Sequence, residues 1–226
     1  MRITAEAKAE TKDRILEVAT KLFTTAGWEN TTTRGIASRA GIAAGTLFNY
    51  FESKEAIVAA LMSVALQEAQ EQIRKRGSGG ESIEEDLFSL IWTELRSLSR
   101  YRVFLPVAAE SIFGHMSRSS SNGPGESLRV KHFEAVEQIL AGHGISTPRP
   151  LTMELYWILY LGVFTYWATD NSPKQEDTLA LLDQSLKLFV TALNQTPERE
   201  KIYERKFKRS HRRPTRGNRK GRTKRR

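Results

Sequence analysis

The chain contains no cysteine among its 226 residues. This absence excludes disulfide bonds, thiolate metal sites and a cysteine nucleophile. Its four histidines, His115, His132, His143 and His211, fall in different segments without the spacing of metal ligands. The chain also lacks GxSxG, HExxH and a glycine-rich phosphate loop. We therefore expect no catalytic site, no metal site and no cofactor.

Long apolar runs are also scarce. Residues 155–168 are strongly apolar, but this 14-residue stretch is bracketed by Glu154 and Asp170, whereas a membrane-spanning helix needs about 18 to 20 apolar residues. The stretch suits a buried helix. The start of the chain, MRITAEAKAETKDR, has no apolar segment typical of a signal peptide. These features predict a soluble, cytoplasmic protein that does not contact a membrane.

Positive charge is unevenly distributed. The net charge is +9, but residues 198–226 hold 15 Lys/Arg and 3 Asp/Glu, which leaves 20 basic and 23 acidic residues in the rest of the chain. Residues 196–226 are predicted to form a disordered basic tail. We favour contact between this tail and DNA phosphates because the rest of the chain is acidic; the alternative is a solvated tail without a specific role. A competing interpretation of the whole chain is a helical protein that binds nucleic acid or a membrane surface through this tail.

Apolar residues recur at helical spacing along most of the chain, which predicts an all-α fold of about nine helices and no strand. The first ten residues are expected to be frayed, with Thr11 as the first N-cap. The predicted helices cover residues 12–26, two short segments within 31–51, and then 53–76, 83–99, 103–113, 126–141, 151–170 and 173–194.

The stretch TTTRGIASRAGIAAGTLFNYFESKEAI, residues 31–57, says most about function. It predicts two short helices joined by a tight turn at Gly41. Ala37, four residues earlier, lets the helices cross closely, and glycine accepts the positive φ of the turn. The second helix of such a helix-turn-helix can lie in the major groove of DNA. The Ala-x-x-x-Gly pattern alone also fits a hairpin in any helical bundle.

Three short motifs make this stretch more specific: GTL at 45–47, NYF at 49–51 and SKEA at 53–56. Together with RILEVATKLFTTAGWENTTTRGIA at 14–37, they resemble the TetR family of transcriptional regulators over roughly the first quarter of the chain. The resemblance implies a homodimeric repressor that binds a palindromic operator in double-stranded DNA and is released by a small ligand. It also implies a helix-turn-helix domain over residues 1–56 and an effector-binding and dimerisation domain over 57–195, ahead of the tail.

Residues expected to touch DNA lie at the start of the first short helix and along the second. A threonine at position 32 or 33 caps the first helix, and its hydroxyl suits a phosphate. Asparagine pairs with adenine, and the threonine methyl contacts the methyl of thymine. The resemblance extends DNA contact to the exposed side of the second helix and to two phosphate-binding positions. The full set is Thr32, Thr33, Ala43, Ala44, Gly45, Thr46, Phe48, Asn49, Tyr50 and Lys54.

This sequence departs from the family at three of these positions. Family members often carry polar or basic residues where Ala43 and Ala44 stand, and a tyrosine where Phe48 stands. Residues 1–56 hold 8 basic and 7 acidic side chains, so the domain has little general attraction to DNA. We therefore expect base readout through Thr46 and Asn49 to matter more, with the two helices of a dimer reading half-sites about 34 Å apart.

The remaining predictions concern the effector and the dimer. Aromatic side chains on helices most often form a core, but they also line pockets for apolar or aromatic effectors. Glu94 and His115 are further candidate anchors. The pocket candidates are Phe88, Trp92, Phe104, Glu110, Phe113, Trp157, Tyr160 and Phe164. The last two helices are apolar on more than one face, which favours a symmetric four-helix bundle over burial inside one chain. The predicted interface is Leu179, Leu182, Leu186, Phe189 and Leu193.

Overall fold

A computed structural model describes residues 4–76, 79–113 and 124–194 of the chain. Within these ranges the protein is all-helical, with nine α-helices, as predicted, and two 3-10 helices. The α-helices are α1 (Ala5–Thr25), α2 (Thr33–Arg39), α3 (Ala44–Phe48), α4 (Lys54–Arg76), α5 (Ile83–Leu98), α6 (Leu105–Phe113), α7 (Pro124–Gly142), α8 (Pro150–Thr169) and α9 (Glu176–Asn194); η1 (Ser99–Tyr101) and η2 (Pro173–Gln175) are 3-10. The predicted tail and His115 lie outside the described residues.

Helix α1 begins earlier than expected. Its N-cap is Thr4, whose side chain accepts a hydrogen bond from the backbone N–H of Ala7. Thr11 is not a cap: it lies inside the helix and donates its hydroxyl to the carbonyl of Ala7 at 2.8 Å. The segment AEAKAE is rich in strong helix formers. A helical start at Ala5 is therefore favoured over the frayed end that the polar composition suggested.

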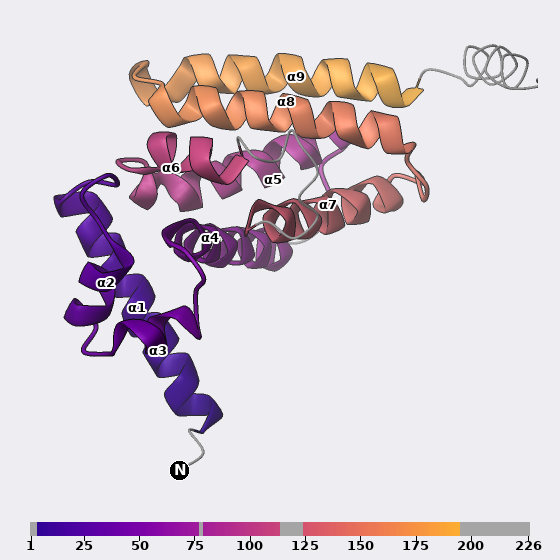
Figure 1. Ribbon diagram of the computed structural model, residues 1–226. Helices are drawn as coiled ribbons and strands as arrows, with labels where there is room; N and C mark the ends of the chain where they lie inside the picture. The colour runs from indigo at the N-terminus through magenta and orange to yellow at the C-terminus, as the bar shows by residue number, and fades with distance from the viewer. Residues whose placement is uncertain (1–3, 77–78, 114–123, 195–226) are drawn as a thin grey trace, which may run out of the picture. The chain divides into compact units, whose positions relative to one another are not determined.

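The first three helices enclose a small core. Ile15, Phe23, Ile36 and Leu47 are fully buried, so α1 covers the α2–α3 unit (Figure 1). The turn between α2 and α3 has the expected geometry, because Gly41 has φ of +69°. The backbone N–H of Ile42 donates to the carbonyl of Ala37 at 3.0 Å. The tight turn predicted at Gly41 is confirmed.

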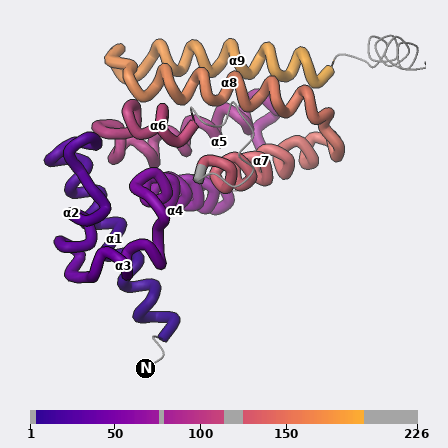
Figure 2. The backbone as a smooth tube through the Cα atoms, in the orientation of Figure 1, coloured from indigo at the N-terminus to yellow at the C-terminus, as the bar shows by residue number. Residues whose placement is uncertain are grey.

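The other six helices form the body. Helix α4 connects the first three helices to it, and the side chain of Ser53 caps α4 by accepting from the N–H of Ala56. Helix α5 contacts α4 and α7, and α6 contacts α8. Helices α8 and α9 run side by side in opposite directions as an outer layer (Figure 2). None of the helices in the described ranges combines the length and apolarity that a membrane span requires.

The turn between α8 and α9 is held by polar contacts. Asp170 is buried and accepts hydrogen bonds from the backbone N–H of Ser172 at 2.7 Å and from the N–H and hydroxyl of Thr178. The hydrogen bond from the Thr178 hydroxyl is the main cause that lowers the pKa of Asp170 to about 2. Arg102 donates to the carbonyls of Trp167 and Asp170 at the end of α8. Arg102 therefore links the segment between η1 and α6 to the outer layer.

The apolar stripe of α9 faces the inside of the protomer, which corrects the predicted dimer interface. Leu182, Leu186 and Phe189 are buried without any partner chain, and the rings of Phe189 and Tyr156 are 4.8 Å apart. A side chain that already packs against α8 has no surface left for a second copy. The other two predicted interface residues, Leu179 and Leu193, are half-buried.

A different set of apolar side chains remains on the outside of α8 and α9. The exposed large side chains there are Leu151, Leu155, Ile158, Tyr166 and Leu188. The four on α8 follow helical spacing and therefore share one face. Gly162 lies on the same face and is exposed, so it adds no bulk there. We call this set the outer stripe.

Candidate functional site

Helix α3 is anchored by one buried residue and presents the rest outward. Leu47 is fully buried, whereas Phe48 keeps 51% of its surface exposed. Gly45 and Asn49 are exposed as well, and Thr46 is half-buried. The candidate reading face is therefore at the surface and open to a duplex.

The two threonines at the start of α2 differ in role. The Thr32 side chain caps α2 by accepting from the N–H of Gly35 at 3.1 Å, which confirms the cap at position 32. Thr33 is half-buried, as is Tyr50, and the Tyr50 ring packs against the core. Arg34, one residue after Thr33, is exposed. Because the first helix of a helix-turn-helix crosses the DNA backbone, Arg34 is a candidate phosphate contact that is absent from the set predicted from the sequence.

Lys54 lies inside the domain instead of reaching outward. Its ammonium donates to the carbonyls of Trp28 at 3.0 Å and Thr31 at 3.5 Å. It also lies 4.2 Å from the centroid of the Trp28 ring. These contacts explain a cation at the start of α4 without a phosphate. We therefore leave Lys54 out of the DNA face.

In the body, four of the predicted pocket residues come together. The ring centroids of Phe113 lie 6.3 Å from Trp157 and 5.7 Å from Phe164, and those of Trp157 and Tyr160 are 5.2 Å apart and stacked. Trp157, Tyr160 and Phe164 are buried. The rings contact one another, so this aromatic cluster is also part of the core.

A buried polar chain adjoins the aromatic cluster. His132 on α7 lies between Glu94 on α5 and Tyr156 on α8: its Nδ1 is 2.9 Å from Glu94 Oε2, and its Nε2 is 2.9 Å from the Tyr156 hydroxyl. Burial and then the charge of Glu94 raise the pKa of Tyr156 and of Tyr160 well above the ordinary value. Both phenols therefore stay protonated. We call Glu94, His132 and Tyr156 the buried triad.

The other predicted pocket residues lie elsewhere. Phe104 packs with its ring centroid 5.1 Å from Phe23 of α1 and 5.8 Å from Tyr101. It therefore joins the body to the helix-turn-helix and does not belong to the aromatic cluster. Glu110 is exposed, whereas Phe88 and Trp92 are half-buried on α5. Because its carboxylate is at the surface, Glu110 is not placed to bind a ligand within the aromatic cluster.

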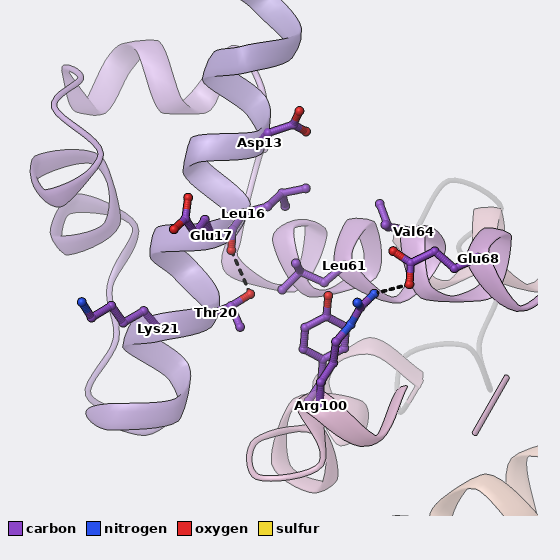
Figure 3. A pocket seen from close by; sticks show the side chains of 10 residues that line it. Asp13, Leu16, Glu17, Thr20, Lys21, Leu61, Val64, Glu68 and Arg100 are labelled. Carbon is purple, nitrogen blue, oxygen red and sulfur yellow. Dashed lines mark hydrogen bonds and ion pairs between the residues drawn. The ribbon is translucent and has the colours of Figure 1, made fainter. Parts of the chain in front are cut away.

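A cleft of about 440 Å³ opens where α1 meets α4 and η1 (Figure 3). Leu16 and Leu61 contribute apolar surface to it, and an ion pair between Arg100 and Glu68 at 2.6 Å lies at one side. Its lining residues are Asp13, Leu16, Glu17, Thr20, Lys21, Leu61, Val64, Glu68, Arg100 and Tyr101. The cleft is therefore lined by residues of α1, α4 and η1.

Two family models match the chain, one near its start and one over its second half. Residues 15–61 match the model of bacterial regulatory proteins of the tetR family, and residues 87–207 match the tetracyclin repressor-like C-terminal domain. The second match alone spans more than half of the chain. The chain is a member of the TetR family. It is a DNA-binding transcriptional regulator of the helix-turn-helix type, as its resemblance at residues 14–56 implied.

Individual relatives of this TetR-family regulator agree with that assignment. An uncharacterised HTH-type regulator of Bacillus subtilis, YhgD, is 23% identical over 79% of this chain and 94% of its own length. The transcriptional repressor KstR2 of Rhodococcus jostii is 30% identical, over 40% of this chain and 45% of its own length.

Solved structures show the same fold. FadR of Thermus thermophilus, a TetR-family repressor solved in complex with lauroyl-CoA, has a TM-score of 0.57 at 23% identity and covers 79% of this chain and 93% of its own. A TetR regulator of Nitrosomonas europaea has a TM-score of 0.59 at 19% identity and covers 80% and 98%. At these identities the likeness concerns the fold of this TetR-family regulator and not its ligand.

Proposed function

We propose that this protein is a ligand-responsive repressor that binds a palindromic operator as a homodimer. The proposal of DNA readout is supported chiefly by the exposed face of α3 around Asn49. The buried side chain of Leu47 holds this helix in place. The side chains of Thr46 and Asn49 have no hydrogen-bond partner within the described part of the chain, so they are available to base edges. Arg34 and the hydroxyls of Thr32 and Thr33 are proposed to contact phosphates.

The Asn49→Ala variant tests this reading face. Loss of a bidentate contact to adenine weakens binding by about 1–3 kcal/mol per half-site and relaxes the preference at one position of each half-site. Gln138→Ala is the matched control, because Gln138 is an exposed amide on α7. An Asn49→Ala protein that keeps both affinity and sequence preference contradicts the proposed face.

The outer stripe supports the proposed homodimer. Leu151, Ile158 and Leu188 are 78%, 65% and 63% exposed, and exposed apolar surface on this scale marks an interaction site. Because the stripe lies along α8 and α9, a second copy packed on it forms a four-helix bundle about a twofold axis. This pairing retains the two predicted helices but uses Leu188 on α9 in place of the predicted α9 stripe.

For the effector we propose a small apolar or aromatic molecule that binds in the body near the aromatic cluster. The T. thermophilus relative in complex with lauroyl-CoA supports an apolar chain as the first probe. Coupling to DNA requires that the effector favour a body conformation in which the two α3 helices no longer fit successive major grooves. Helix α4 and the Phe23–Phe104 contact are two routes from the body to the DNA-binding helices within the described residues.

A titration tests the effector proposal directly. Lauroyl-CoA is added to the dimer bound to its preferred duplex, and release is followed by fluorescence anisotropy. Release that saturates with ligand supports an apolar effector. Unchanged binding with lauroyl-CoA and with a panel of aromatic acids and amines contradicts it.

A further inference from the structure

Phe48 is an apolar side chain on the face that is proposed to meet DNA. Within residues 4–53, all of which the structure describes, it is the one large hydrophobic side chain that is exposed. Its neighbours behave differently: Leu47 is fully buried, and Tyr50 packs against the core. Phe48 contributes nothing to that core, so packing does not explain an aromatic residue at this position.

The rest of the reading face is also poor in hydrogen-bonding side chains. Ala44 and Phe48 are four residues apart and lie on the same side of α3. Ala43 and Gly45 have no polar side chain either. The side-chain hydrogen-bonding groups of the face are therefore the Thr46 hydroxyl and the Asn49 amide. A face of this composition lacks the paired donors of arginine or lysine that normally recognise guanine.

The major groove offers one apolar group on its base edges, the C5 methyl of thymine. A phenyl ring and alanine methyl groups are the side-chain types that contact it. We propose that Phe48, supported by Ala44, recognises thymine methyl groups beside an adenine held by Asn49. The inference rests on the proposed function and adds to it a chemical class for the half-site: A·T base pairs that are distinguished by their methyl groups.

The experiment uses the full-length protein and the highest-affinity duplex selected from random DNA. Each thymine of one half-site is replaced in turn by deoxyuridine, which keeps the pairing with adenine and removes only the C5 methyl. Removing a methyl that Phe48 contacts weakens binding about fourfold, the value expected for one buried methylene-sized group. Deoxyuridine outside the half-sites leaves the dissociation constant unchanged.

A double-mutant cycle assigns the effect to Phe48. In Phe48→Ala the same deoxyuridine substitution no longer weakens binding, because the methyl has lost its partner. Val103→Ala is the matched protein control: Val103 is 72% exposed, lies outside the helix-turn-helix, and its truncation leaves the deoxyuridine effect intact. Phe48→Leu, which keeps an apolar side chain, retains a reduced effect.

The outcomes separate this inference from the proposed function. A protein that selects a defined duplex yet binds all deoxyuridine versions equally overturns the methyl contact and leaves the operator function standing. A Phe48→Ala variant that loses affinity equally for thymine and deoxyuridine duplexes also overturns it, since the ring then contacts the sugar–phosphate backbone. A protein that enriches no sequence overturns both.

Discussion

A single ammonium group holds the loop between α1 and α2. Lys54 donates to two carbonyls of that loop and lies over the ring of Trp28. Because a hydrogen bond to a charged group and a cation–π contact each stabilise by about 1–2 kcal/mol, the group has a structural role of useful size. Arg34 on α2 is exposed and is the contrasting case, a cation free to meet a phosphate.

The two cations predict opposite phenotypes. Lys54→Met lowers the free energy of unfolding by about 1–2 kcal/mol and leaves the salt dependence of DNA binding unchanged. Arg34→Gln leaves the unfolding free energy unchanged and lowers the log–log salt slope by about 0.9 for each protomer on the DNA, about 1.8 for the dimer. Urea titration and anisotropy at several salt concentrations measure the two quantities. A reduced salt slope in Lys54→Met restores its predicted role as a phosphate contact.

The buried triad is expected to contribute to the stability of the fold through the pair Glu94 and His132. Glu94 and His132 are both fully buried, and removal of one partner of such a pair leaves the other uncompensated. His132→Ala is therefore expected to lower the free energy of unfolding by about 3–5 kcal/mol. Replacing Glu94 and His132 together with Leu costs less than the single change, which urea titration of the three proteins checks. Equal losses in the single and double variants contradict a paired interaction.

Among the helical elements, the α8–α9 turn makes stability depend on pH. The pKa of Asp170 in the folded protein is about 2, below its ordinary value of 3.8, because Thr178 and Ser172 donate hydrogen bonds to the carboxylate. The folded state therefore binds fewer protons than the unfolded state between these two values. The stabilisation is complete above about pH 5 and is lost as the pH falls through 4 towards 2.

A comparison of wild type and Asp170→Asn measures this effect. The wild type is more stable at pH 6, and the difference in urea midpoint between the two proteins shrinks as the pH falls from 5 to 3. Glu137→Gln, an exposed position on α7, is the control and shows no such trend. A difference that stays constant over this range argues against an ionised Asp170 as the source of stability.

The positions of the helices could be predicted from local sequence patterns. The Gly41 turn, the Ser53 cap and the order of the helices were predictable because each depends on residues near in sequence. The side-chain contacts between different helices could not be predicted in this way. The buried triad joins α5, α7 and α8, and the only sequence signal was a glutamate at position 94 on an apolar stripe.

The same limit explains the corrected residues of the body and the interface. Phe104 looked like the other aromatic residues of the body, but its partner is Phe23, which is 81 positions earlier. The stripe of α9 was predicted to contact a second copy because helical periodicity does not show which of two apolar faces is buried within the protomer. Leu186 is buried within the protomer, and Leu188 is exposed on the outside of α9.

At the scale of the whole molecule, the proposed homodimer pairs two copies through the outer stripe, and DNA readout is expected to depend on that pairing. Ile158→Glu places a charge in the middle of that stripe, where Ile158 is 65% exposed, so the fold is expected to persist while the dimer dissociates. Analytical ultracentrifugation reports the mass, and operator affinity falls because each monomer then binds a half-site alone. Val107→Glu on α6, also at an exposed valine, is the control that stays dimeric.

Selection of bound sequences from random duplex DNA tests the central claim most directly. A dimer that reads through two α3 helices enriches an inverted repeat, with half-site centres one helical turn of about 34 Å apart or a multiple of it. Asn49→Ala relaxes the preference at symmetry-related positions of that repeat. The predicted result is a palindrome for the wild type and a weakened palindrome for the variant. Enrichment of no sequence, or of a repeat that Asn49→Ala leaves unchanged, would contradict the account.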